Sequence, residues 1–286
     1  MTTAVLPGAP HEPRRSTPSW NDTLLVFMKW CQGRVNLNKN LSIIAAHFGA
    51  DYAGLSRWDE ETRCLRTAGF AGNLRTRHAS ITDHAFADAV CGDWTGQLKE
   101  GAAVLHSELL DGGQVGDARL SQWLHRKNIR DIGVLCVAAD GRKRDLIELH
   151  FQTRPTPHWS TICSLQGPFF ADIYAGRRQG LMLETLLQGG RTASRPDRDA
   201  TQAAILSSSN PAGLTRCEWG ICALIANGLS RDGIADELGV KSSTVQTHLR
   251  NIYAKTGRER FHALALQLVS PEERAHLALV QGAAAA

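Results

Sequence analysis

The sequence predicts two domains of different fold class, an α+β domain followed by a small all-α domain. Three observations carry this prediction. Between residues 52 and 152, several segments show the two-residue apolar period of strands, and helical periods surround them. After residue 212 only helical periods occur. Between the two regions, after Gly189-Gly190, the composition turns to Arg, Ser, Asp, Pro and Ala, which is typical of an exposed linker.

Five segments follow from these patterns. The first 19 residues hold four of the ten prolines, cannot build a core, and are predicted to be disordered. The expected division is a tail at 1–19, an α+β domain at 20–180, a linker region at 181–211, an all-α domain at 212–270 and a C-terminal tail at 271–286.

Within residues 20–180 the order of elements favours one antiparallel sheet with helices packed on it. Two hairpins are expected, the second with Asp140-Gly141 at its turn. The expected strands are 52–58, 63–69, 101–107, 131–139 and 144–152, and the expected helices are one beginning at Trp20, 36–50, 81–91, 117–127 and 160–178.

Composition bounds the class of protein. The net charge of +4 is only mildly basic, so charge alone does not indicate nucleic acid. The seven cysteines contain no Cys-x-x-Cys pair, and their odd number suits reduced thiols. No apolar run approaches the roughly 20 residues of a membrane span, and residues 1–19 lack the core of a signal peptide. We therefore expect a cytoplasmic protein without a membrane partner.

The most informative stretch is 214–255. Ile234, Ala235 and Leu238 lie on one face of a short helix, and Gly239 can take the left-handed conformation that ends it. A longer helix follows from about 242 to 255, with its own buried stripe. Its remaining face contains hydrogen-bonding side chains and no acidic one, as contact with base edges and phosphates requires. Two helices joined in this way match a DNA-binding helix-turn-helix.

Residues 214–258 resemble the DNA-binding domain of LuxR-type (GerE-type) transcription regulators. The resemblance implies a four-helix domain whose third helix reads DNA and whose fourth often dimerises. The matching positions are Leu214, Thr215, Glu218, Ile225, Ala226, Gly228, Leu229, Ser230, Ile234, Ala235, Leu238, Gly239, Thr244, Val245, His248, Leu249, Asn251, Ile252, Tyr253, Lys255 and Gly257.

The same resemblance implies roles for individual residues. Gln246, Thr247 and Arg250 would face bases, whereas Thr244, His248 and Lys255 would lie nearer the phosphate backbone. Lys241 adds a possible phosphate contact. The complete predicted DNA-binding set is Lys241, Ser242, Ser243, Thr244, Gln246, Thr247, His248, Arg250, Asn251 and Lys255.

Three departures from the family pattern stand out. Arg216-Cys217 replaces the usual Pro-Arg, and Lys241 replaces the usual Ser, which predicts that the helix cap shifts to Ser242. Gly233 stands where the family usually has Glu. Without that Glu the capping box begun by Ser230 is lost, and glycine weakens the helix by about 1 kcal/mol.

The N-terminal domain is similar in its order of elements to GAF/PAS-like sensor domains. It lacks the Asp-Pro pair of the lactone receptors in the LuxR family, the acidic set of response regulators and a phosphate-binding Gly-x-x-x-x-Gly-Lys-Ser/Thr loop. An apolar ligand cavity is instead predicted to be lined by Tyr52, Trp58, Trp94 and Trp123, although core packing is the commoner role of tryptophan.

The remaining chemistry favours a regulator and not an enzyme. No nucleophile–base pair or cofactor loop is visible, and the scattered histidines show no metal-ligand spacing, so no metal or cofactor is expected. Cysteines such as Cys136 and Cys163 suit buried apolar positions better than a redox sensor. The predicted partners are double-stranded DNA and a second copy of the chain, because one recognition helix contacts few base pairs. The input is either a small molecule or a partner protein bound at 20–180.

Overall fold

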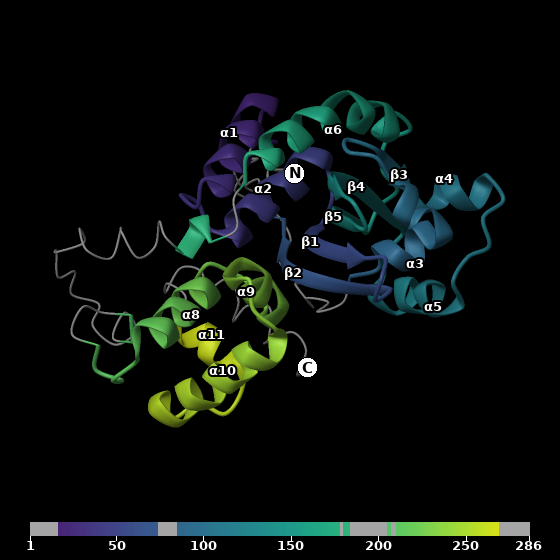
Figure 1. Ribbon diagram of the computed structural model, residues 1–286. Helices are drawn as coiled ribbons and strands as arrows, with labels where there is room; N and C mark the ends of the chain where they lie inside the picture. The colour runs from purple at the N-terminus through teal and green to yellow at the C-terminus, as the bar shows by residue number, and fades with distance from the viewer. Residues whose placement is uncertain (1–16, 74–84, 178–179, 184–204, 207–209, 269–286) are drawn as a thin grey trace, which may run out of the picture.

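The computed structural model describes residues 17–73, 85–177, 180–183, 205–206 and 210–268. An α+β domain and a helical domain lie against each other, as Figure 1 shows. This confirms the predicted fold class. The expected tails and most of the expected linker lie outside the described residues, so the domain boundaries stay predictions.

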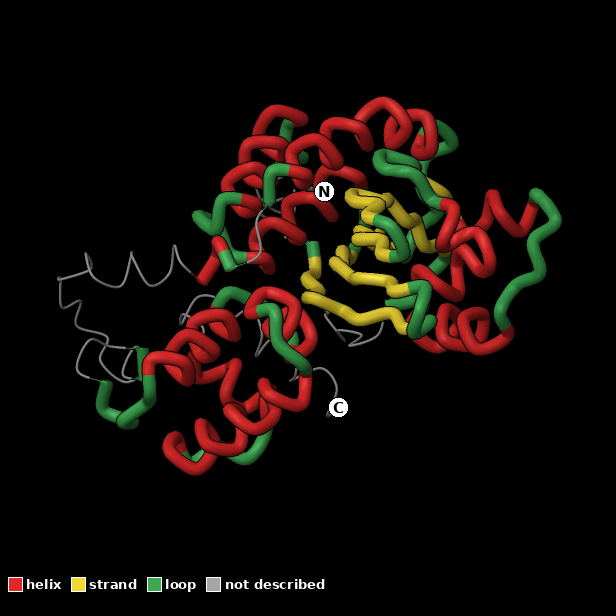
Figure 2. The backbone as a smooth tube through the Cα atoms, viewed as in Figure 1, coloured by secondary structure: helices red, strands yellow, loops and turns green. Residues whose placement is uncertain are grey.

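The α+β domain is built on one antiparallel sheet, drawn in yellow in Figure 2. Its five described strands have the order β2-β1-β5-β4-β3. Both predicted hairpins are present, and β2 and β3 form the edges. The β2–β1 pairing is irregular, because Leu55 faces Gly69, Ser56 faces Thr67, and Ala68 is skipped. The strands are β1 (Tyr52–Asp59), β2 (Cys64–Gly72), β3 (Ala103–Leu105), β4 (Asp131–Asp140) and β5 (Lys143–Phe151).

Helices cover both faces of the sheet. On one face, α2 and α6 pack on the strands and α1 lies against both, around Phe27, Trp30 and Phe170. On the other face, α3 and α5 enclose a second apolar cluster. The elements are α1 (Trp20–Cys31), α2 (Leu37–Phe48), α3 (Ala87–Cys91), the 3₁₀ helix η1 (Gly92–Gln97), α4 (His106–Asp111), α5 (Ala118–Lys127) and α6 (Trp159–Ala175).

Two expected elements are shorter than predicted. The expected strand at 101–107 ends at Leu105, because the Asp131 carboxylate accepts hydrogen bonds from the Ser107 backbone N–H (3.2 Å) and hydroxyl (2.6 Å) and α4 begins there. In the expected helix at 81–91, the described helical residues begin at Ala87. The Phe86 N–H just before it donates to the buried Glu148 carboxylate.

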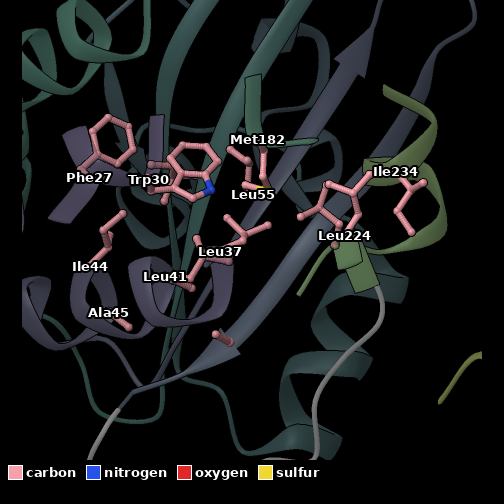
Figure 3. Close-up of a cluster of buried hydrophobic side chains, with 14 of the residues drawn as sticks. Phe27, Trp30, Leu37, Leu41, Ile44, Ala45, Leu55, Met182, Leu224 and Ile234 are labelled. Atoms are coloured by element: carbon pink, nitrogen blue, oxygen red, sulfur yellow. The ribbon is translucent and has the colours of Figure 1, made fainter. Parts of the chain in front are cut away.

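Over residues 210–268 the structure describes four helices, α8 (Arg216–Ala226), α9 (Arg231–Leu238), α10 (Ser242–Thr256) and α11 (Phe261–Leu268). The core of this helical domain joins the core of the α+β domain. Figure 3 shows this continuity: Leu37 and Leu55 of the α+β domain and Leu224 and Ile234 of the helical domain belong to one buried cluster, together with Met182 between them. The two domains are therefore joined by apolar packing as well as by the chain.

Candidate nucleic-acid interface

Helix α10 is fixed to the domain by the stripe that the sequence predicts. Val245, Leu249 and Ile252 are fully buried. Gly239 ends α9 in the left-handed conformation, at φ 66°, and turns the chain toward α10. The opposite side of α10 therefore faces outward, which is the arrangement of a recognition helix.

The predicted DNA-contacting residues separate into an exposed group and a half-buried group. Ser242, Gln246 and His248 are half-buried at the borders of the helix. The exposed residues are Lys241, Ser243, Thr244, Thr247, Arg250, Asn251 and Lys255. The structure thus brings the predicted set together on α10 and its N-cap.

Two of these residues make contacts that their predicted roles did not include. The prediction that Ser242 caps α10 is wrong: Lys241 is the N-cap residue, and the Ser242 hydroxyl donates to Asp232 on α9 over 2.7 Å. The Lys255 ammonium donates to the Glu218 carboxylate (2.7 Å) and to the Gly213 carbonyl (3.1 Å). Its predicted phosphate contact therefore competes with bonds inside the domain.

Helix α8 is tied to α10 through Glu218. Thr215 caps α8, and Thr215 and Glu218 complete a capping box. The Glu218 carboxylate is almost fully buried and accepts from the Thr215 N–H (2.8 Å) as well as from Lys255. Burial raises the pKa of Glu218, but the bonds from Lys255 and Thr215 outweigh it and hold that pKa below its ordinary value. This pair links α8 to the C-terminal part of α10.

Cys217, at a position where LuxR-type domains usually have Arg, lies beside α10. Its thiol sulfur is 3.7 Å from Nε2 of His248. Partial burial and the neighbouring Glu218 raise the pKa of the Cys217 thiol. A neutral thiol thus occupies a place where the family has a permanent positive charge.

The structure explains why a glycine occupies position 233, which the sequence alone does not. Ser230 still caps α9 by accepting the Gly233 N–H over 3.1 Å, so half of the capping box remains. A Cβ atom at Gly233 would lie only 2.5 Å from the carbonyl oxygen of Ala68 in β2. The glycine is required by the close approach of the α+β domain.

The aromatic residues predicted to line a ligand cavity do not all come together. Tyr52, Trp58 and Trp123 belong to the buried cluster under α3 and α5, whereas Trp94 is 59% exposed on η1. Their predicted contact with a ligand stays a prediction.

The sequence reading missed a buried polar group in the same layer. The Glu148 carboxylate accepts from the Ser56 hydroxyl (3.0 Å) and the Phe86 N–H (2.8 Å), and His150 Nε2 lies 3.3 Å from it. Alternation along β5 places Glu148 and His150 on one face of the sheet, and that signal is present in the sequence.

Other kinds of site find little support among the residues that the structure describes. No group of three or more His, Cys, Asp or Glu side chains there is arranged to hold a metal ion. None of the helices in this part of the chain has the length and apolar character that a membrane crossing requires.

Comparison with known proteins agrees with the geometry of the helical domain. Residues 212–260 match the family described as bacterial regulatory proteins, luxR family. The HTH-type transcriptional regulators MalT of Yersinia pestis (strain Pestoides F) and of Serratia proteamaculans (strain 568) are each 50% identical over 44 residues, which are 15% of this chain and 5% of MalT. The chain therefore covers about one-twentieth of the length of these curated relatives.

Two solved structures align over most of the chain at low similarity. The crystal structure of Escherichia coli SdiA in space group P6522 covers 91% of this chain and 98% of its own, with 14% identity and a TM-score of 0.34. SdiA in complex with octanoyl-rac-glycerol covers 86% of this chain and 91% of its own, with 14% identity and a TM-score of 0.36. The family match at 212–260 is the finding that bears on function: this segment is a LuxR-family helix-turn-helix domain.

Proposed function

We propose that this chain, whose residues 212–260 form a LuxR-type helix-turn-helix domain, is a sequence-specific DNA-binding transcription regulator. The observation that carries the proposal is the outward face of α10. That face holds exposed hydrogen-bonding side chains and no carboxylate, on a helix whose opposite side is fully buried. Such a helix fits the major groove, which admits one α-helix.

The side chains on α10 divide between the two kinds of DNA contact. Arg250 suits a bidentate contact with guanine, and Gln246 and Asn251 suit adenine. Lys241, exposed at the N-cap, suits a phosphate, as do the hydroxyls of the first turn. Phosphate contacts supply most of the affinity and make it fall with salt, whereas the base contacts supply sequence preference.

The protein acts as a homodimer on a roughly two-fold symmetric operator. A single recognition helix reads too few base pairs to select a site in a genome. Two copies double the number of base contacts, and the spacing of the half-sites then follows from the distance between the two helices.

The N-terminal domain controls this activity through a ligand. The support is the buried layer that joins Tyr52, Trp58 and Trp123 to the polar group at Glu148, since ligand pockets combine apolar walls with a few fixed polar groups. The second candidate is a partner protein bound on the same domain. Native mass spectrometry of the purified full chain separates them, because a co-purifying small molecule supports the ligand.

The DNA-binding proposal is tested with a duplex recovered by in vitro selection with the full chain. Arg250→Ala should weaken binding to this duplex by roughly 1–3 kcal/mol and relax the preference at one base position. Lys241→Ala should weaken binding to selected and scrambled duplexes alike. Arg142→Ala, at the exposed turn between β4 and β5, removes the same charge outside the helical domain and serves as the control.

Two results would contradict these assignments. Binding of Arg250→Ala that equals the wild type would remove Arg250 from the base-reading set. A loss confined to one base position in Lys241→Ala would show that Lys241 reads a base and does not contact a phosphate.

A further inference from the structure

A cleft of about 810 Å³ lies between the sheet and the helical domain. Strand β2 borders the helical domain (Figure 1) and forms one wall of this cleft. The other walls come from the first turns of α9 and α11 and from α10. Small-molecule sites are commonly about 300–1,000 Å³ in volume, so the cleft is large enough for an organic ligand.

Part of the cleft wall is apolar and is only partly covered by the protein. Leu65 of β2 and Phe261 and Leu266 of α11 line the cleft, and each of them is half-buried. Apolar surface that stays in contact with water is stabilised when a ligand with an apolar body covers it. These three side chains therefore favour a ligand that is apolar over part of its surface.

The cleft is distinct from the buried layer around Glu148. Neither Glu148 nor His150 lines it. Phe70 is common to both places, because it lines the cleft and its ring packs edge-on against the His150 ring, with 4.9 Å between the centroids. A ligand in the cleft would therefore contact Phe70 without contacting the Glu148 carboxylate.

Two arginines give the cleft its positive charge. Arg231 is the first residue of α9, Arg260 directly precedes α11, and both are exposed. The Arg231 guanidinium lies over the Phe261 ring, 5.5 Å from its centroid, and this contact holds it on the apolar wall. Within the described part of the chain neither arginine forms an ion pair, so both can bind a ligand.

Other groups around the two arginines also suit an anion. Helix N-termini carry partial positive charge, and the N-termini of both α9 and α11 border the cleft. Tyr253 and Gln246 of α10 line it as well and add a hydroxyl and an amide. Guanidinium groups bind carboxylates through two parallel N–H···O bonds, which makes a carboxylate the best-matched head group.

Two carboxylates on the cleft wall limit where an anion can lie. The Asp232 carboxylate accepts the Ser242 hydroxyl over 2.7 Å and is thus directed toward the start of α10. Glu259 lies next to Arg260, is exposed and would repel an anion. The position that combines a guanidinium, an aromatic wall and a helix N-terminus is beside Arg231.

We propose that this cleft binds an amphipathic organic anion, a molecule with an apolar body and one carboxylate. Arg231 and Arg260 hold the carboxylate. The apolar body lies against Leu65, Phe261 and Leu266. This site is additional to the DNA-binding face of α10 and to the ligand proposed for the Glu148 layer, and it depends on neither.

The test titrates the full chain with 2-naphthoate, which has an apolar ring system and one carboxylate, by isothermal titration calorimetry. Naphthalene-2-methanol has the same ring system without the charge and is the ligand control. Arg231→Met and Arg260→Met each remove one cation and keep an unbranched apolar side chain. Arg142→Met, at the exposed turn between β4 and β5, removes the same charge outside the cleft. Urea unfolding of each variant shows that the fold is retained.

The proposal predicts one 2-naphthoate per chain and at least tenfold weaker binding of the alcohol. Arg231→Met and Arg260→Met should each weaken binding of the anion at least tenfold, whereas Arg142→Met should match the wild type. Tenfold corresponds to about 1.4 kcal/mol, close to the lower end for a hydrogen bond to a charged group. Glu259→Gln, which removes the opposing carboxylate, should bind the anion at least as tightly as the wild type.

Three results would overturn the proposal. The first is no binding of 2-naphthoate in the millimolar range, or equal affinity for the acid and the alcohol. The second is undiminished binding by both Arg231→Met and Arg260→Met, which would place the anion elsewhere, the Glu148 layer included. The third is an equal loss in Arg142→Met, which would show a general effect of charge. None of these results bears on DNA binding, which the duplex titrations measure separately.

Discussion

Replacing Glu218 with alanine tests whether the ion pair between Glu218 of α8 and Lys255 of α10 holds α10 in place. The change removes the acceptor for the Thr215 N–H and for the Lys255 ammonium. Loss of the capping-box contact costs about 1 kcal/mol. A hydrogen bond to a charged group contributes about 1.5–3 kcal/mol, and the lower end applies because the Lys255 side chain is 34% exposed and water can resolvate it. The expected loss of unfolding free energy is therefore about 2.5 kcal/mol.

The assay is urea unfolding of the full chain followed by circular dichroism at 222 nm, with hydrogen exchange of α8 and α10 to assign the transition. Lys255→Met and the double variant complete a cycle. Because the two side chains share one bond, the double variant should lose about 1.5 kcal/mol less than the sum of the single losses. A loss below about 1 kcal/mol for Glu218→Ala, or strict additivity in the cycle, would refute the reasoning.

Two further predictions follow from ionisation. The pKa of Glu218 lies below its ordinary value of 4.5, so the unfolded chain binds the proton more readily. The contribution of ionised Glu218 to the free energy of unfolding is complete above pH 4.5 and is lost as the pH falls through the lowered pKa of the folded state. Glu218→Gln should therefore lack this part of the pH dependence of stability. Brief alkylation of the native protein with iodoacetamide, read by peptide mass spectrometry, should label Cys64 and Cys217. Buried thiols such as Cys136, whose pKa burial raises to about 12, should stay unlabelled until urea is added, and early labelling of Cys136 would contradict its burial.

Local periodicity was enough to predict the elements that depend on it. The stripe of Val245, Leu249 and Ile252 defines α10 in the sequence and in the structure alike. The hairpin of β4 and β5 follows in the same way from alternation and from Asp140-Gly141. The residues that form each of these patterns are close together in the sequence. Each element can therefore be predicted without knowledge of tertiary contacts.

Contacts between distant segments could not be predicted. From the sequence alone, Gly233 only weakens its helix. The reason for the glycine is the carbonyl oxygen of Ala68, which leaves no room for a side chain and lies far away in the sequence. The same holds for Lys255, whose bond to Glu218 crosses between helices. Ser242 is a further case, because its hydroxyl donates a hydrogen bond to Asp232 of α9 and does not cap α10.

The close packing at Gly233 limits how such regulators can exchange parts. A helix-turn-helix domain from a relative with the usual Glu at this position would bring a side chain against the backbone of Ala68. Fused to this α+β domain, such a helix-turn-helix domain would fold but would not pack against β2. Recombination at this boundary would then yield chains whose two domains do not pack together, unless glycine arises at that one position.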